Sequence, residues 1–152
     1  EKARATVANF NITTDIIVGF PGESDSEWSQ TLKYVQEAKF GNIHIFTYSP
    51  RLGTKAASMQ GQVSSGIKKN RSRELNQVSS VLRKDALKNL LGGEFDVLWE
   101  HPQEHNALNW VGYTPHYHRV VSPLGEKSLN FTNIHKTLLT DISDDDRFLI
   151  GR

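Results

Sequence analysis

The sequence GFPGES, at residues 19–24, joins an apolar run to a polar segment and is the first place where ligand chemistry is expected. Gly19 and Gly22 would let the backbone approach a flat ligand closely, and Pro21 would stiffen the turn. In parallel α/β folds, ligands bind at the carboxyl ends of the strands. The turn lacks the G-K-[ST] signature of a phosphate-binding loop, so a nucleoside triphosphate is not the expected ligand. A tight connection without any ligand is an equally good interpretation of this spacing.

Two histidine patterns raise the question of a metal. The sequence HPQEH, at residues 101–105, has the H-x-x-E-H spacing of a zinc peptidase. That spacing requires a helix, and Pro102 after an apolar run favours a solvated loop instead. His116 and His118 would lie on one side of a strand, but no third ligand is suitably spaced. We therefore expect no metal site, and a chain with 0 cysteines offers no thiolate for zinc or an iron–sulfur cluster.

Two segments have residue types suited to nucleic acid. Residues 64–91 carry seven basic side chains against two acidic ones, and this imbalance favours an anionic neighbour such as RNA over an ordinary solvated face. In the sequence HYHR, at residues 116–119, Tyr117 and Arg119 would share one side of a strand, where the tyrosine ring could stack on an unpaired base. The alternative is that Tyr117 packs in the core of its domain.

The elements that would position these residues follow from hydrophobic periodicity. Residues 12–20 read as a buried strand in which the apolar residues Ile16, Ile17 and Val18 are consecutive, which is typical of a parallel sheet that is covered on both faces. Ser24 and Glu27 have the spacing of a capping box at the start of a helix, and residues 42–48 read as a second strand. A strand, a helix and a strand with short connections predict a parallel βαβ unit. A further helix is expected over residues 64–91.

The second half of the chain has a different pattern and a different charge. Residues 1–92 contain 13 basic and 8 acidic residues, a balance of +5, whereas residues 93–152 contain 5 and 9, a balance of −4. We expect a boundary at Gly92 and Gly93, followed by a small antiparallel barrel of short strands. These strands are expected at residues 94–101, 107–114, 117–122 and 136–142, with turns at Pro115 and at residues 123–125.

Three motifs that occur in order, ITTDIIVGFPGES, FTYSPRLGTKAA and VGYTPHYHRVV, resemble the C-terminal part of the radical S-adenosylmethionine methylthiotransferases of tRNA. The branch that the chain resembles most modifies threonylcarbamoyl-adenosine beside the anticodon, and the resemblance covers residues 10–122. It implies an α/β fold in residues 1–87, as part of a TIM-like barrel with parallel strands. Residues 88–152 would then be an OB-like, all-β antiparallel barrel called the TRAM domain.

The resemblance implies S-adenosylmethionine as a cofactor that this chain binds in part. It also implies two 4Fe–4S clusters in the complete protein, held by cysteines that this chain does not contain. The sequence DIIVG is similar to the G-x-I-x-G strand motif of radical enzymes, with Asp15 in place of the first glycine. The implied cofactor-binding residues lie on this strand, on the turn after it and at the end of the next strand; they are Asp15, Ile17, Gly19, Pro21, Gly22, Glu23, Tyr48, Ser49 and Arg51.

The resemblance also implies tRNA, contacted at its anticodon stem-loop, as the partner, and neither DNA nor a membrane. The residues expected to contact RNA are Lys68, Lys69, Tyr113, Tyr117 and Arg119. The implied enzyme is a cytoplasmic transferase, and this chain alone would be inactive. Two alternatives stay open: a stand-alone RNA-binding module, and a protein-interaction fragment without affinity for RNA, which the negative balance of residues 93–152 favours.

Overall fold

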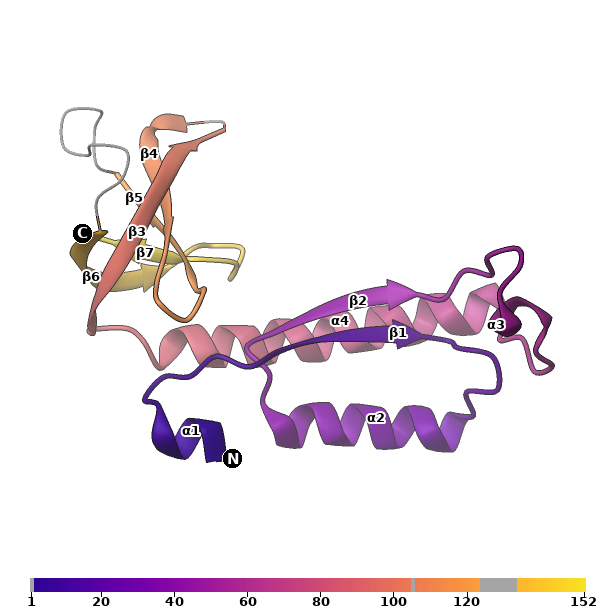
Figure 1. Ribbon diagram of the computed structural model, residues 1–152. Coiled ribbons are helices and arrows are strands. Elements are labelled where there is room, and N and C mark those ends of the chain that lie inside the picture. The colour runs from indigo at the N-terminus through magenta and orange to yellow at the C-terminus, as the bar shows by residue number, and fades with distance from the viewer. Residues whose placement is uncertain (1, 105, 124–133) are drawn as a thin grey trace. The chain divides into compact units, whose positions relative to one another are not determined.

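The computed structural model describes most of the chain, namely residues 2–104, 106–123 and 134–152 (Figure 1). The chain divides into two compact units. The strand–helix unit is Ile12–Leu82, and the barrel unit is Arg83–Arg152 together with the chain as far as Asn11. The fold class expected from the sequence, a parallel α/β segment followed by a small β-barrel, is confirmed.

Two parallel strands form the sheet of the strand–helix unit. β1 (Thr13–Val18) pairs along its whole length with β2 (Asn42–Thr47), and α2 (Asp25–Ala38) connects them. The helix begins after the N-cap Ser24, whose side chain and backbone exchange both hydrogen bonds of a capping box with Glu27. The predicted βαβ unit and its start signal are therefore confirmed.

α2 and the long helix α4 (Ser65–Lys88) cover one face of this sheet. Side chains of both strands and both helices form a single core, which includes Val18, Trp28, Val35, Ile43 and Leu75. Successive strand residues point to opposite faces, so the neighbours of these core residues lie on the other face. The consecutive apolar residues 16–18 suggested burial on both faces, but Ile17 is 53% exposed. The unit also contains the single-turn helix α3 (Lys55–Ser58).

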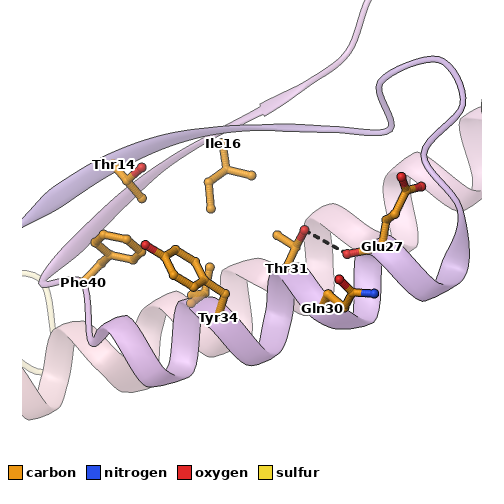
Figure 2. Close-up of a pocket in the computed structure, with 8 residues that line it drawn as sticks. Thr14, Ile16, Glu27, Gln30, Thr31, Tyr34 and Phe40 are labelled. Atoms are coloured by element: carbon orange, nitrogen blue, oxygen red, sulfur yellow. Dashed lines mark hydrogen bonds between the residues drawn. The ribbon is translucent and has the colours of Figure 1, made fainter.

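A groove of about 460 Å³ lies between β1 and one flank of α2 (Figure 2). Thr14 and Ile16 reach it from the strand, and Tyr34 and Phe40 line its other side. Within the described residues β1 pairs with β2 alone, so the edge of β1 away from β2 has no strand beside it. The groove contains none of the residues expected to bind the cofactor.

Five strands close the barrel unit in the order β3-β4-β5-β7-β6. The pairs are antiparallel, apart from the parallel pair β5–β7. β7 is absent from the sequence expectations because three residues are too few to show a pattern of alternation. The short helix α1 (Lys2–Thr6) belongs to the same unit. The strand bounds are Glu94–Gln103 for β3, Asn106–Tyr113 for β4, Arg119–Ser122 for β5, Ile134–Ile142 for β6 and Leu149–Gly151 for β7.

Large apolar side chains fill the barrel. Its buried residues come from all five strands and from the end of α4 and the turn after it; they include Leu87, Leu90, Val97, Trp99, Trp110, Val120, Leu139 and Leu149. Leu139 and Leu149 are 0% exposed, so the barrel interior is a packed core and not a channel.

Two local expectations for the barrel unit are wrong. β3 extends to Gln103, so Pro102 and Gln103 lie in a strand and not in a loop. β5 begins at Arg119, so Tyr117 and His118 precede the strand in which they were expected. His105 lies outside the described residues, as do the last two residues of the turn expected at 123–125. No helix in the part of the chain that the structure describes is long and apolar enough to cross a membrane.

Candidate functional site

The uncovered face of the two-stranded sheet brings together four side chains, two of which the sequence analysis selected. In the parallel register Asp15 lies opposite His44, and Ile17 lies opposite Phe46. Ile17 and Phe46 are 53% and 54% exposed and form an apolar patch toward the carboxyl ends of the strands. His44 and Phe46 were missed. The alternation in NIHIFT, combined with the predicted parallel pairing, would have placed them on this face.

The turn after β1 uses its backbone donors within the protein. The N–H of Gly19 donates to Oε2 of Glu23 at 2.8 Å, and the N–H of Glu23 donates to the carbonyl of Phe20 at 3.0 Å. The N–H of Gly22 donates to the carbonyl of Gly61 at 2.9 Å. Of the residues expected to bind a cofactor, those in the turn therefore shape the end of the strand and do not present these N–H groups to a ligand.

The position of Gly19 requires a residue without a side chain, because of its backbone conformation and because of a close neighbour. Its φ is +75°, a value that side chains disfavour, and a Cβ at this position would overlap the Cγ of Lys68. Lys68 crosses from α4, and its Nζ donates to the carbonyl of Tyr48 at 3.0 Å. Lys68 was expected to contact RNA, but its side chain joins the ends of the two strands.

Arg71 ties the same turn to α4. This guanidinium is 5% exposed and donates to Oε2 of Glu23 and to Oδ1 of Asp25, both at 2.6 Å. It also lies over the ring of Trp28, 5.8 Å from the ring centroid. Burial alone would lower the pKa of Arg71, but the hydrogen bonds that it donates to Asp25 and Glu23 raise that pKa overall. The turn is thus held by a permanently charged residue.

Tyr48 supplies a polar atom that the fold leaves without a partner. Its ring packs edge-on against Phe20, with the ring centroids 5.3 Å apart. The buried hydroxyl makes no hydrogen bond to any described residue, and such a group is costly unless something else satisfies it. Ser49 and Arg51 follow on the exposed chain after β2. This end of the sheet thus has an exposed apolar strand face and a buried hydroxyl without a hydrogen-bond partner among the described residues.

Part of the positive charge of α4 is compensated by acidic residues that are distant in the sequence. Within the barrel unit, Nζ of Lys84 lies 2.9 Å from Oδ2 of Asp146, and Arg83 donates to the backbone carbonyl of the same residue. Arg71 is neutralised as described above. Lys69, Arg73 and Lys88 are exposed basic side chains of the helix, and Lys88 lies 3.7 Å from Asp85 one turn earlier. The seven-to-two ratio in the sequence therefore overstates the charge that is available to RNA.

On the barrel unit, three residues expected to contact RNA lie near one another. Tyr113 and Arg119 are directly opposite in the β4–β5 ladder. The guanidinium of Arg119 lies over the ring of Phe148, 5.5 Å from the centroid. Tyr117 is 83% exposed, and its ring centroid is 6.5 Å from that of Tyr113. The alternative that Tyr117 packs in the core is therefore wrong.

A compact turn between β4 and β5 displays Tyr117. The N–H of Tyr117 donates to the carbonyl of Thr114 at 2.9 Å, and the N–H of Thr114 donates to the carbonyl of His118 at 3.0 Å. The N–H of His118 in turn donates to the hydroxyl of Thr114. Burial lowers the pKa of His118 to about 4, with a smaller contribution from His116, so the buried ring is neutral at pH 7. The described residues contain no group of three or more side chains that could hold a metal ion.

The comparisons with known proteins agree in pointing to tRNA modification. The chain is 36% identical over 126 residues to a tRNA-2-methylthio-N(6)-dimethylallyladenosine synthase of Moorella thermoacetica, which covers 83% of this chain and 28% of that protein. It is 39% identical over 117 residues to the threonylcarbamoyladenosine tRNA methylthiotransferase MtaB of Thermotoga maritima, which covers 77% of this chain and 26% of that protein. The chain is homologous to a segment of the tRNA methylthiotransferases.

The homology covers only part of the length of these relatives. The MtaB protein of Bacillus subtilis is 34% identical over 124 residues, which cover 79% of this chain and 27% of that protein. The chain thus spans about a quarter of the length of the curated relatives that it matches. Relatives named for dimethylallyladenosine and relatives named for threonylcarbamoyladenosine match this chain at similar identity. Sequence identity therefore does not assign the chain to one of these two branches. No family model matches the sequence.

Proposed function

We propose that this chain is part of a radical S-adenosylmethionine transferase that adds a methylthio group to a modified adenosine beside the anticodon of tRNA. The observation that carries the proposal is the homology to tRNA methylthiotransferases over 83% and 77% of the chain. Residues 1–87 would be the last part of the radical barrel, and residues 88–152 the TRAM domain. The adenosine proposed is threonylcarbamoyl-adenosine, as the three sequence motifs suggest.

In this proposal the strand–helix unit supplies part of the wall around S-adenosylmethionine. Ile17 and Phe46 would contact the flat nucleoside, and the hydroxyl of Tyr48 would find its missing hydrogen-bond partner there. Gly19 and Glu23 would hold the strand end in position. The cofactor supplies the methyl group and the radical chemistry when it is bound. The two 4Fe–4S clusters would be held outside this chain, which contains 0 cysteines.

The barrel unit would contact the anticodon stem-loop of tRNA. Tyr113, Tyr117 and Arg119 offer ring faces and a cation, and these groups can stack on unpaired bases and contact phosphate. Lys69 and Arg73, which are exposed on α4, would add an attraction to phosphate that weakens as the salt concentration rises. Lys68 would also contact RNA, since its ammonium group donates one hydrogen bond to the carbonyl of Tyr48 and has further donors.

The test of the cofactor wall is the variant Ile17→Asp in the complete protein that carries this segment. A carboxylate at this position would face the nucleoside, so we expect the dissociation constant of S-adenosylmethionine to rise about tenfold or more, which corresponds to about 1.4 kcal/mol. Equilibrium dialysis measures this constant. Thr13→Asp is the matched control, because Thr13 lies on the same strand face at the opposite end of β1.

The two variants separate a site from a general effect on the fold. We expect Thr13→Asp to bind S-adenosylmethionine like the parent, and both variants to melt cooperatively. Unchanged affinity in a folded Ile17→Asp protein, or an equal loss in both variants, would place the cofactor elsewhere.

A further inference from the structure

A groove of about 620 Å³ on the outside of the barrel combines aromatic rings with carboxylates. Its volume lies within the range of about 300–1,000 Å³ that is usual for small-molecule sites. Leu98 and Ile134 give it apolar surface, Tyr113 and Tyr117 give it rings, and Asp96 and Glu100 give it two carboxylates. This mixture is unlike a phosphate-binding surface, since a carboxylate repels a phosphate.

We propose that this groove binds one unpaired nucleobase that carries an exocyclic amino group, with Tyr117 stacking on the base and Glu100 accepting a hydrogen bond from the amino group. The proposal rests on the proposed function, in which RNA is the partner of the barrel unit. It adds the chemical class of the base that the barrel unit prefers.

Tyr117 has a strained backbone conformation, and its side chain is not buried. Its φ is +61°, in the left-handed region that suits glycine or asparagine at the end of such a turn. An aromatic residue usually offsets strain of this kind by burial, yet Tyr117 is 83% exposed. Strained and exposed residues of this type gather at binding sites. The free ring face is available for a base to stack on.

A local irregularity of β3 sets the direction of the Glu100 side chain. In the ladder with β4, Trp99 pairs with Gly112 and His101 pairs with Val111, so Glu100 is the extra residue of a β-bulge. Bulges often re-aim a side chain next to a functional site. Glu100 is exposed, and it forms no ion pair with any residue that the structure describes.

The second carboxylate of the groove is already occupied. Oδ1 of Asp96 lies 3.3 Å from Nζ of Lys136. Glu100 is therefore the acceptor that remains for a ligand. A carboxylate accepts a hydrogen bond from the N4 amino group of cytosine or the N6 amino group of adenine. The O4 carbonyl of uracil is itself an acceptor, so it cannot form this hydrogen bond and would be repelled by the carboxylate. The groove should favour amino-bearing bases and keep the phosphates outside.

The test uses the chain itself with oligocytidylate and oligouridylate of equal length, two pyrimidine probes that differ in whether position 4 is an amino group or a carbonyl. Dissociation constants are measured by fluorescence anisotropy at one salt concentration. We expect the parent to bind the cytidylate about fivefold more tightly, as the net gain from one typical hydrogen bond would give. Glu100→Gln should abolish or reverse this preference, because an amide can donate to O4 of uracil.

Two further variants serve as controls. Glu94→Gln makes the same charge change on an exposed residue of β3 that does not line the groove, and it should keep the preference of the parent. Tyr117→Ala should weaken binding of both probes by a similar factor, because stacking is tolerant of sequence.

The outcomes separate this inference from the function on which it rests. If the chain binds neither probe nor a tRNA anticodon stem-loop, the proposed RNA function and this inference both fail. If it binds RNA but shows no preference for cytidylate, or if Glu100→Gln keeps that preference, only the groove assignment is overturned. Loss of the preference in Glu100→Gln but not in Glu94→Gln supports the assignment.

Discussion

Replacing Arg71 with methionine is expected to lower the free energy of unfolding of the strand–helix unit by about 3 kcal/mol, because removal of one partner leaves a buried charge uncompensated. The charge left behind is Glu23, whose side chain is 15% exposed and also accepts the N–H of Gly19. Asp25 contributes little to the loss, since its side chain is 98% exposed. The measurement is hydrogen exchange of the amides of β1 and α2.

A second substitution shows whether charge or packing causes the loss at Arg71. Adding Glu23→Gln to Arg71→Met removes the uncompensated charge, so the double variant should regain part of the stability. Arg73→Met is the matched control, because Arg73 is an exposed arginine of the same helix. A loss in Arg71→Met no larger than in the control would show that this clamp does not hold the turn.

Acidification from pH 7 to pH 5 is expected to lower the stability of the barrel unit by about 2 kcal/mol, through the protonation of His118 in the unfolded chain. The pKa of this histidine is lowered from 6.5 to about 4 in the folded protein. Between these values the unfolded state binds the proton and the folded state does not. Stability is therefore complete above about pH 6.5, falls as the pH decreases and reaches its lower level below about pH 4.

Urea unfolding followed by tryptophan fluorescence measures this dependence. A Trp28→Phe background removes the tryptophan of the other unit, so that the signal comes from Trp99 and Trp110 in the barrel. Glutamine at position 118 cannot take up a proton, so His118→Gln should have a much flatter dependence from pH 7 to pH 5. Equal slopes for the parent and His118→Gln would show that another group causes the acid sensitivity.

Much of the fold was predictable because local signals agreed with the tertiary structure. The reciprocal side chains of Ser24 and Glu27 mark the start of α2 within a few residues, without reference to any distant contact. The parallel pairing of β1 and β2 follows from the short helical connection alone. β7 could not be predicted, since its three residues carry no periodicity of their own, although it pairs with the neighbouring β6 as well as with the more distant β5.

The candidate sites were less predictable because they depend on contacts between distant segments. Lys68 and Arg71 looked like members of a basic surface, but their partners Tyr48 and Glu23 lie in turns that no helical pattern reveals. Phe46 was missed because its position on the exposed face depends on the pairing of β2 with β1, which sets it opposite Ile17. Tyr117 was assigned to a strand because apolar residues follow it, whereas the hydrogen bonds of Thr114 close a turn first.

The most direct measurement is mass spectrometry of nucleosides from the tRNA of cells with and without the gene that encodes this segment. If the segment belongs to a tRNA methylthiotransferase, the methylthio derivative of threonylcarbamoyl-adenosine should disappear without the gene, and its unmodified precursor should accumulate. Loss of the methylthio derivative of dimethylallyladenosine would support the enzyme class and change the substrate branch. Unchanged amounts of both methylthio nucleosides would contradict the account.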